Sequence, residues 1–264
     1  MAINLSEQYI QENYTGLKSL WFKLLIRCYR YRYAWRVSRL RVESGYSQSH
    51  HPTAQRRIEP CTIRSATSLE KAHFREHKWV FLENFFEKNY FERLSLIDIP
   101  KYHLKPMAQL FKSYDNGLIN PEYTYKRYPP ISECVNFFSS PKFESWIEEL
   151  AADNLARVFD RMKTTRAYRG SSCIPHVDSI AKELVSGEEN QSFNVIIFVK
   201  GTGGTNAGGT CIMRDNEYDI EFEPTNLTNS CLIYDAGQIF HGFPPMKKGK
   251  KRWMMAFNMN HTSF

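Results

Sequence analysis

The stretch "FNVIIFVK", residues 193–200, decides the fold of this chain. It is a run of aromatic and β-branched residues that is interrupted by Asn194 and ends at Lys200, and glycine follows it. A short apolar run of this composition, bounded by a turn residue, predicts a buried β-strand. Because side chains alternate across a strand, we expect Asn194, Ile196 and Phe198 to share one face, and we expect that face to point inward.

Similar short runs follow at regular intervals and are separated by Gly, Asn and Pro: "GTCIMRD", "YDIEFEP", "SCLIYDAG" and "RWMMAFNMN". Regularly spaced short strands predict a sandwich or a jelly-roll barrel. The glycine-rich segment 201–209, "GTGGTNAGG", lacks the Lys-Ser/Thr pair of a phosphate-binding loop and the helix that follows a dinucleotide-binding turn. It is therefore predicted to be a turn between two strands.

Helices are predicted upstream of these strands. An apolar run at residues 79–82 precedes a helix-like segment, and a second helical stretch, "SSPKFESWIEELAADNLARVF", has Ser140 as its N-cap and Pro141 at its first position. The apolar residues of the second helix recur every three or four positions, which predicts that one face docks on a sheet. These residues are Phe143, Trp146, Ile147 and Leu150.

The composition is that of a soluble globular protein. The chain has 264 residues, of which 42% are hydrophobic and 24% charged. Its six cysteines are scattered without a C-x-x-C pair, no secretory signal is recognisable, and no apolar stretch reaches the roughly 18 residues of a membrane span. A reducing, cytoplasmic location is the expectation, with no cysteine-bound zinc.

Most of the net charge of +7 lies near the N-terminus, because residues 1–60 hold ten Lys/Arg and four Glu. Residues 18–41 mix arginines with aromatic side chains. This pattern is compatible with peripheral binding to an anionic membrane surface, with an acidic partner, or with nucleic acid. The simpler alternative is an amphipathic helix that packs on the body of the protein while its arginines stay in solvent.

The segment "CIPHVDS", residues 173–179, places His176 and Asp178 two positions apart. On an extended chain these side chains point the same way, as two ligands of one metal would. A third ligand, His241, stands just beyond the predicted strand "CLIY", and two histidines with one carboxylate form the facial triad of non-haem Fe(II) sites. H-x-D alone is a weak signal, and an isolated histidine is more often a core or surface residue.

Arg252 strengthens this interpretation. It opens the strand "RWMMAFNMN" and would share a face with Met254 and Ala256. A buried arginine there could hold a dicarboxylate through a bidentate ion pair, whereas the preceding lysines are expected to stay in a hydrated loop. These lysines are Lys247, Lys248, Lys250 and Lys251.

With these motifs, the chain resembles the Fe(II)/2-oxoglutarate-dependent dioxygenases, in particular the prolyl-4-hydroxylase-like branch. The resemblance runs from about residue 79 to residue 260 and is clearest over "RAYRGSSCIPHVDS", "FNVIIFVK", "AGGTCIM", "CLIYDAGQIFHGFP" and "RWMMAFNM". It implies a mainly β fold with some α, a double-stranded β-helix (jelly-roll, cupin-like) core with N-terminal supporting helices. We expect residues 66–264 to form the oxygenase domain and residues 1–65 a basic helical extension and linker.

The resemblance also implies roles for individual residues. His176, Asp178 and His241 would bind Fe(II), Arg252 would hold 2-oxoglutarate as co-substrate, and ascorbate could serve as reductant. Tyr168 matches a tyrosine that hydrogen-bonds the co-substrate, although a core tyrosine is an equal alternative.

One position departs from the family pattern. Phe198 stands where many relatives place a co-substrate tyrosine, so one hydroxyl contact is missing. Asn194 would lie near the iron, where it could orient substrate or serve as an ordinary buried hydrogen-bonding residue.

The implied activity is hydroxylation of a C–H bond in a small-molecule or carrier-bound biosynthetic metabolite, with release of succinate and CO2. Retention of Asp178 argues against a halogenase. Nucleic-acid demethylation is not favoured, because Asn258 stands where that branch repeats an arginine. A peptidyl or protein hydroxylase and a non-catalytic cupin-like binding protein are the alternatives.

Overall fold

The computed structural model describes residues 16–17, 60–99, 104–109, 112–118, 127–152, 157–168, 171–178, 192–215 and 219–261. The basic segment 18–41 and most of the predicted extension 1–65 lie outside these ranges. In the part of the chain that is described, no helix combines the length and the apolar character that a membrane span needs.

Four helices lie N-terminal to most of the strands within the described ranges: α3 (Ser68–His77), α4 (Lys88–Ser95), α6 (Pro129–Phe138) and α7 (Pro141–Ala151). The first part of the chain also contributes the strands β1 (Trp79–Glu83), β2 (Leu104–Gln109), β3 (Lys112–Leu118), β4 (Arg157–Ala167) and β5 (Ser172–His176). The remaining strands are β6 (Ser192–Gly201), β7 (Cys211–Met213), β8 (Ile220–Phe222), β9 (Ser230–Asp235), β10 (Phe240–Phe243) and β11 (Arg252–His261). The five strands predicted from residue 193 onward are confirmed.

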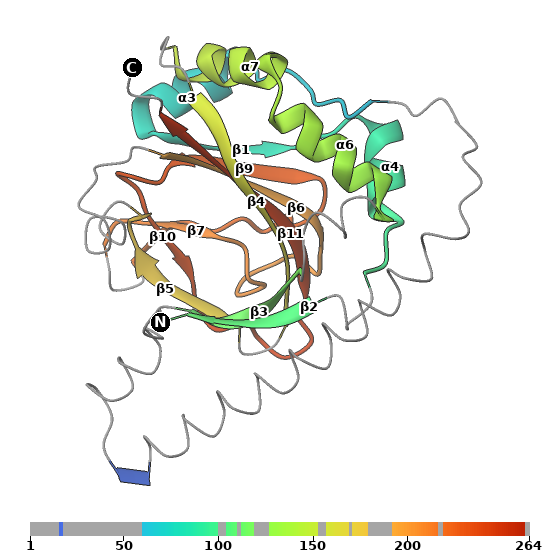
Figure 1. Cartoon of the computed structure of the whole chain (residues 1–264). Coiled ribbons are helices and arrows are strands. Elements are labelled where there is room, and N and C mark those ends of the chain that lie inside the picture. Colours follow the sequence, from blue (N-terminus) through green and yellow to red (C-terminus); the bar gives the residue numbers. More distant parts are fainter. Residues whose placement is uncertain are drawn as a thin grey trace, which may run out of the picture.

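The strands are hydrogen-bonded in the order β1-β9-β6-β11-β4-β3-β5-β10-β7-β8, and β2 pairs with β3. Every pairing between these strands is antiparallel. The sheet folds over itself, so that β1, β9, β6, β11 and β4 form a layer covered by the helices, while β5, β10 and β7 lie on its other side (Figure 1). This is the mainly β, jelly-roll architecture with supporting helices that the sequence predicts.

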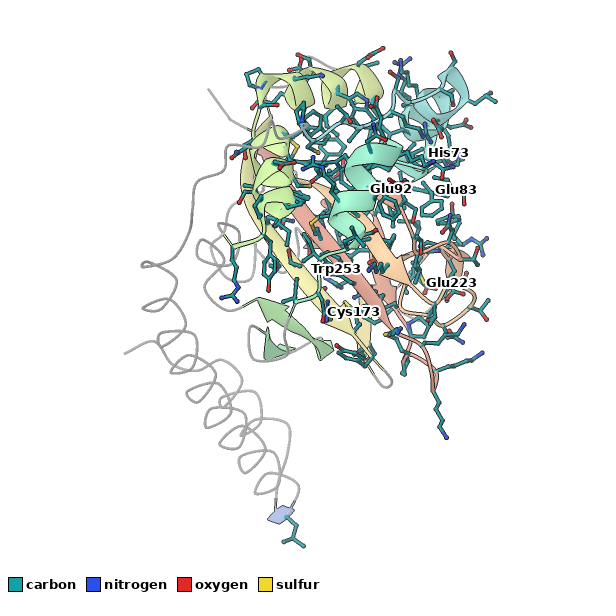
Figure 2. All side chains as sticks on the ribbon, turned by 90° about the vertical axis from the view of Figure 1, so that its right-hand side faces the viewer. His73, Glu83, Glu92, Cys173, Glu223 and Trp253 are labelled. Atoms are coloured by element: carbon teal, nitrogen blue, oxygen red, sulfur yellow. The ribbon has the colours of Figure 1, made fainter. Side chains whose placement is uncertain are left out.

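The two faces of β6 build two different cores. Val195, Ile197 and Val199 pack in the cluster between sheet and helices, where the ring of Phe257 stacks on Phe138 at 4.1 Å between centroids. Figure 2 shows the dense side-chain packing of this layer. The opposite face, with Ile196 and Phe198, packs inside the barrel against residues of β9 and β11 such as Leu232 and Ala256. The predicted inward face is confirmed.

Helix α7 begins where the sequence predicts, with Ser140 at the N-cap position and Pro141 first in the helix. Its predicted face is buried through Phe143, Ile147 and Leu150, while Trp146 is partly buried at the edge of the same cluster. The capping interaction itself is absent, because the Ser140 hydroxyl donates to the carbonyl of Phe137 at 2.6 Å instead.

Aromatic side chains join the two strands at the ends of the sheet order. The ring of Trp79 on β1 stacks on Phe222 of β8 at 4.7 Å, and Phe81 lies 5.3 Å from the same ring. These ring contacts connect β1 and β8, which lie at opposite ends of the hydrogen-bonded strand order. The barrel is therefore closed on this side by side-chain packing.

The segment 201–209 forms a turn, as predicted. Gly203, Gly204 and Gly208 all have positive φ, the region that glycine enters at no steric cost. At Gly208 an added Cβ would also lie 2.6 Å from the Met246 sulfur. The turn therefore brings its backbone close to the loop that precedes β11.

Candidate metal centre

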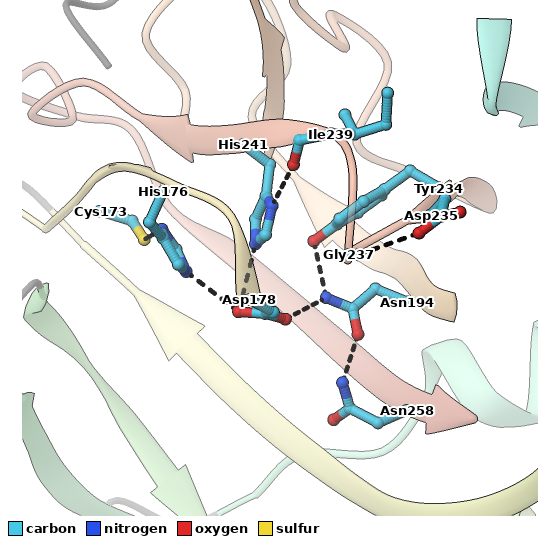
Figure 3. Close-up of polar contacts among 10 residues, drawn as sticks. All are labelled: Cys173, His176, Asp178, Asn194, Tyr234, Asp235, Gly237, Ile239, His241 and Asn258. Carbon is cyan, nitrogen blue, oxygen red and sulfur yellow. Dashed lines mark hydrogen bonds and ion pairs between the residues drawn. The ribbon is translucent and has the colours of Figure 1, made fainter. Parts of the chain in front are cut away.

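The side chains of His176, Asp178 and His241 converge on one point (Figure 3). His176 is the last residue of β5, and His241 lies directly opposite it on β10. Asp178 follows two residues after β5 ends. Its backbone N–H donates to the carbonyl of Ala236 at 2.8 Å, which ties this short extension to the loop between β9 and β10.

The three groups are close enough to share one ion. The Asp178 Oδ1 atom lies 3.3 Å from Nε2 of His176 and 3.8 Å from Nε2 of His241. One potential ligand atom from each residue lies within 4.8 Å of the other two. The predicted juxtaposition of these residues is therefore confirmed, and two imidazoles with one carboxylate are a donor set that suits Fe(II).

Backbone contacts orient the His241 ring toward the same point. Its Nδ1 lies 3.0 Å from the carbonyl oxygen of Ile239. A carbonyl can only accept, so Nδ1 carries the proton and the lone pair of Nε2 is left for a metal. His241 is 4% exposed, and the centroid of the Tyr234 ring lies 4.6 Å from that of its imidazole. On His176, Nδ1 lies 3.8 Å from the Cys173 sulfur, so Nε2 again faces the carboxylate.

Asn194 lies beside this group, as the sequence predicts. Its Nδ2 donates to Asp178 Oδ2 at 2.8 Å and to the hydroxyl of Tyr234 at 3.0 Å. Its Oδ1 accepts from Nδ2 of Asn258. Burial raises the pKa of Tyr234 well above its usual value, so its phenol stays protonated.

Arg252 is buried at the start of β11, with 2% of its surface exposed. Its Nη1 donates to the carbonyl of Gly208, and its guanidinium carbon lies 4.4 Å from the centroid of the Phe243 ring. Among the neighbouring lysines, Lys247, Lys248 and Lys251 are exposed, as predicted. Lys250 departs from the prediction, because it is half-buried and its Nζ donates to the carbonyl of Gly203 at 2.6 Å.

Two further predictions concern aromatic residues. Tyr168, just after β4, is 39% exposed, so its interpretation as a core tyrosine is wrong; its contact with a co-substrate stays a prediction. Phe198 is fully buried inside the barrel, where it offers no hydroxyl.

Sequence reasoning missed two residues of this site, Tyr234 and Asn258. The sequence pattern assigns Tyr234 only to an apolar strand, and it marks Asn258 only as a position where nucleic-acid demethylases have an arginine. The alternation of side chains could have identified both, since Tyr234 shares a face with the inward Leu232, and Asn258 with the inward Ala256.

No family model matches this chain, and no curated protein is similar to it in sequence. Solved structures are similar in fold. A prolyl-4-hydroxylase from Pseudomonas putida has a TM-score of 0.52 at 12% identity, covering 74% of this chain and 98% of its own. The 2-oxoglutarate-dependent (alpha-ketoglutarate-dependent) non-haem epimerase SnoN of nogalamycin biosynthesis has a TM-score of 0.52 at 10% identity, with coverages of 72% and 81%.

A third similar structure is HygX from Streptomyces hygroscopicus, solved with nickel, 2-oxoglutarate and hygromycin B bound. Its TM-score is 0.51 at 11% identity, and the match covers 75% of this chain and 89% of HygX. Identities this low establish a common fold. The chain therefore has the jelly-roll fold that 2-oxoglutarate/Fe(II)-dependent enzymes use.

Proposed function

We propose that this protein is a non-haem Fe(II)- and 2-oxoglutarate-dependent oxygenase that hydroxylates a C–H bond of a small-molecule or carrier-bound biosynthetic metabolite, with release of succinate and CO2. The observation that carries the proposal is the convergence of His176, Asp178 and His241 within 4.8 Å. This convergence occurs in a fold shared with enzymes that use the same co-substrate.

The donor set fits Fe(II) better than it fits structural zinc, calcium or magnesium. Structural zinc sites are closed by four ligands, usually cysteine and histidine, and calcium and magnesium prefer oxygen ligands. Two histidines and one carboxylate instead leave coordination positions open for a co-substrate and dioxygen. Bound there, Fe(II) would supply the oxidative decarboxylation of 2-oxoglutarate and the oxidation of substrate.

The chain's own residues bind, orient and exclude water. Arg252 supplies a buried positive charge with a planar fork that matches a carboxylate of 2-oxoglutarate. The apolar side chains inside the barrel, including Ile196, Phe198 and Leu232, keep water from its interior. Because Phe198 has no hydroxyl, co-substrate binding depends more heavily on Arg252 here than it would in a site with a tyrosine at this position.

We also propose that the basic segment 18–41 acts outside the chemistry, by binding an anionic membrane surface or an acidic partner, while residues 66–264 form the catalytic domain. The charge of the segment supports this role. Binding of the full chain to vesicles with anionic lipids should weaken with salt, and deletion of residues 1–40 should remove it while turnover persists. A deletion variant that folds but turns over no substrate would contradict this division.

The proposed activity is tested by succinate formation. The protein is purified anaerobically, loaded with Fe(II), supplied with 2-oxoglutarate and ascorbate, and exposed to oxygen with a panel of amino acids, peptides, glycans and other metabolites. Succinate formation that one substrate class stimulates supports the proposal and identifies that class. Asp178→Ala and His241→Ala should abolish the stimulation, whereas His77→Ala, an exposed histidine on α3, should retain it.

Two outcomes would overturn the proposal. Stimulated turnover in Asp178→Ala would remove the proposed ligand from the mechanism. A wild-type protein that binds one Fe(II) per chain but forms no succinate with any class would favour the cupin-like binding protein.

A further inference from the structure

We propose that Asn194 is a positioning residue that holds one carboxylate oxygen of Asp178 and leaves the other as the single metal-binding oxygen. This inference deepens the proposed function and rests on its metal site. Figure 3 shows the arrangement: the two histidines lie on one side of the Asp178 carboxylate, and Asn194 lies on its other side.

The two oxygens of Asp178 have different surroundings. Oδ1 is the atom near both histidine Nε2 atoms, at 3.3 and 3.8 Å, whereas Oδ2 accepts from Asn194 Nδ2 at 2.8 Å. An ionised carboxylate only accepts hydrogen bonds, so the amide nitrogen of Asn194, and not its oxygen, must face Oδ2. This assignment fixes the orientation of the amide without reference to any other contact.

Neighbours on both sides hold the Asn194 amide in place. Asn194 on β6 pairs with Tyr234 on β9 and with Asn258 on β11, so the three residues stand side by side across three adjacent strands. The second amide hydrogen goes to the Tyr234 hydroxyl, and the amide oxygen accepts from Asn258. Every polar group of a side chain that is only 5% exposed is therefore engaged.

This support matters because Asp178 lies beyond the end of β5 and lacks a strand of its own. Its backbone N–H donates to the carbonyl of Ala236, and Asn194 holds its side chain through the bond to Oδ2. A carboxylate whose second oxygen is engaged binds a metal through one atom and occupies one coordination position. Asn194 thus keeps open a position that a bidentate carboxylate would fill.

The inference is tested by metal binding rather than by turnover. We expect Asn194→Ala to weaken Co(II) and anaerobic Fe(II) binding by about 10- to 100-fold, the usual effect of losing a partner of a metal ligand. The visible absorption spectrum of bound Co(II) should change as the carboxylate becomes free to rotate. Asn258→Ala should weaken binding in the same direction but less, since it acts through Asn194.

Asn229→Ala is the matched control. Asn229 is also buried, at 9% exposure, and its amide bonds the backbone N–H and carbonyl of Phe86, away from the metal ligands. Its loss should lower the melting temperature and leave both the Co(II) Kd and the Co(II) spectrum unchanged. Asn194→Leu, which keeps the number and branching of the side-chain heavy atoms, is the second variant if Asn194→Ala does not fold, and the same loss of affinity is expected.

The outcomes separate this inference from the proposed function. Wild-type Co(II) affinity and spectrum in the folded Asn194 variant would reduce Asn194 to a structural residue and overturn the inference alone. Wild-type protein that binds metal but never forms succinate would overturn the proposed function, while a weakened Asn194 variant would still support the inference. Wild-type protein that binds neither Co(II) nor Fe(II) would overturn both.

Discussion

His176 and His241 stand directly opposite each other on the antiparallel strands β5 and β10, with ring centroids 4.3 Å apart. The pairing puts two imidazoles from distant parts of the chain on the same face. A slip of one residue in the register would turn one ring to the opposite face of the sheet. The metal site is therefore a property of strand pairing as much as of the H-x-D motif.

Metal binding should stabilise the folded protein measurably. A ligand that binds only the native state at about 100 times its Kd adds about 2.7 kcal/mol to the free energy of unfolding. We expect this increase for anaerobic Fe(II) with wild type and with His77→Ala, and its loss with His176→Ala or after chelation. Chemical denaturation with and without metal measures it. An equal increase in His176→Ala would place the binding site elsewhere.

Two glycines with similar backbone angles should differ in their tolerance of alanine. Gly208 and Gly249 have φ of +83° and +81°, so either substitution forces a left-handed conformation that costs roughly 1–2 kcal/mol. An added Cβ at Gly249 meets nothing within 4 Å, whereas at Gly208 it would lie 2.6 Å from the sulfur of buried Met246. Overpacking of this kind typically costs a further 1–3 kcal/mol or so.

Gly208→Ala should therefore lose about 1–3 kcal/mol more than Gly249→Ala in urea unfolding. The Gly208 carbonyl also accepts from Arg252, so a displaced turn should weaken 2-oxoglutarate binding in that variant alone. Equal stability losses would show that Met246 can move aside without cost.

The sequence predicts those parts of this structure that depend on local patterns. The two-residue alternation of "FNVIIFVK" is enough to assign Ile196 and Phe198 to the barrel interior, because a strand has no other way to bury one face. The same rule predicts that His176 and Asp178 share one side, but Asp178 lies beyond the end of β5 and is held there by Ala236 and Asn194. Pro141 and the apolar repeat of α7 are equally local, and they predict the start and the buried face of that helix.

Other features depend on which strands become neighbours, and a single sequence does not give that. Tyr234 and Asn258 meet Asn194 only because β9 and β11 flank β6. Ser140 shows a different limit. Its position at the N-cap is predictable, but its hydroxyl can bond either a backbone N–H of the first helical turn or a preceding carbonyl, and it bonds the carbonyl of Phe137. The half-buried Lys250 likewise depends on the Gly203 carbonyl of a distant turn.

Glu70 on α3 should contribute to the acid sensitivity of the fold. Its hydrogen bond with Arg64, at 2.6 Å, is the main cause that lowers the pKa of Glu70 from 4.5 to about 2, and a bond from the Thr67 backbone adds to the effect. Because the folded-state pKa is depressed, the stabilisation is fully present above about pH 4.5 and is lost as the pH falls toward 2.

Glu70→Gln should therefore lower the free energy of unfolding at neutral pH and flatten its pH dependence between these two values. Glu87→Gln is the control, since this exposed carboxylate makes no capping bond at α4. Urea titrations at several pH values measure both variants. If the free energy of unfolding of Glu70→Gln falls below pH 4.5 as steeply as that of the wild type, the acid sensitivity arises from other carboxylates.

Arg252 should dominate the binding of 2-oxoglutarate among the basic residues near the start of β11. Removing one partner of a buried charge pair costs roughly 3–5 kcal/mol, whereas exposed pairs contribute about 0–1 kcal/mol. Arg252→Ala should therefore raise the co-substrate Kd by about a hundredfold or more, because each 1.4 kcal/mol is about tenfold. Lys251→Ala, at an exposed neighbour, should change it only a few-fold, and Lys250→Ala tests the half-buried lysine that bonds the Gly203 carbonyl. Titration of 2-oxoglutarate into the anaerobic Fe(II) protein, followed by its charge-transfer absorption, measures each Kd. A large loss at either lysine, with Arg252→Ala near wild type, would move the carboxylate site into the loop.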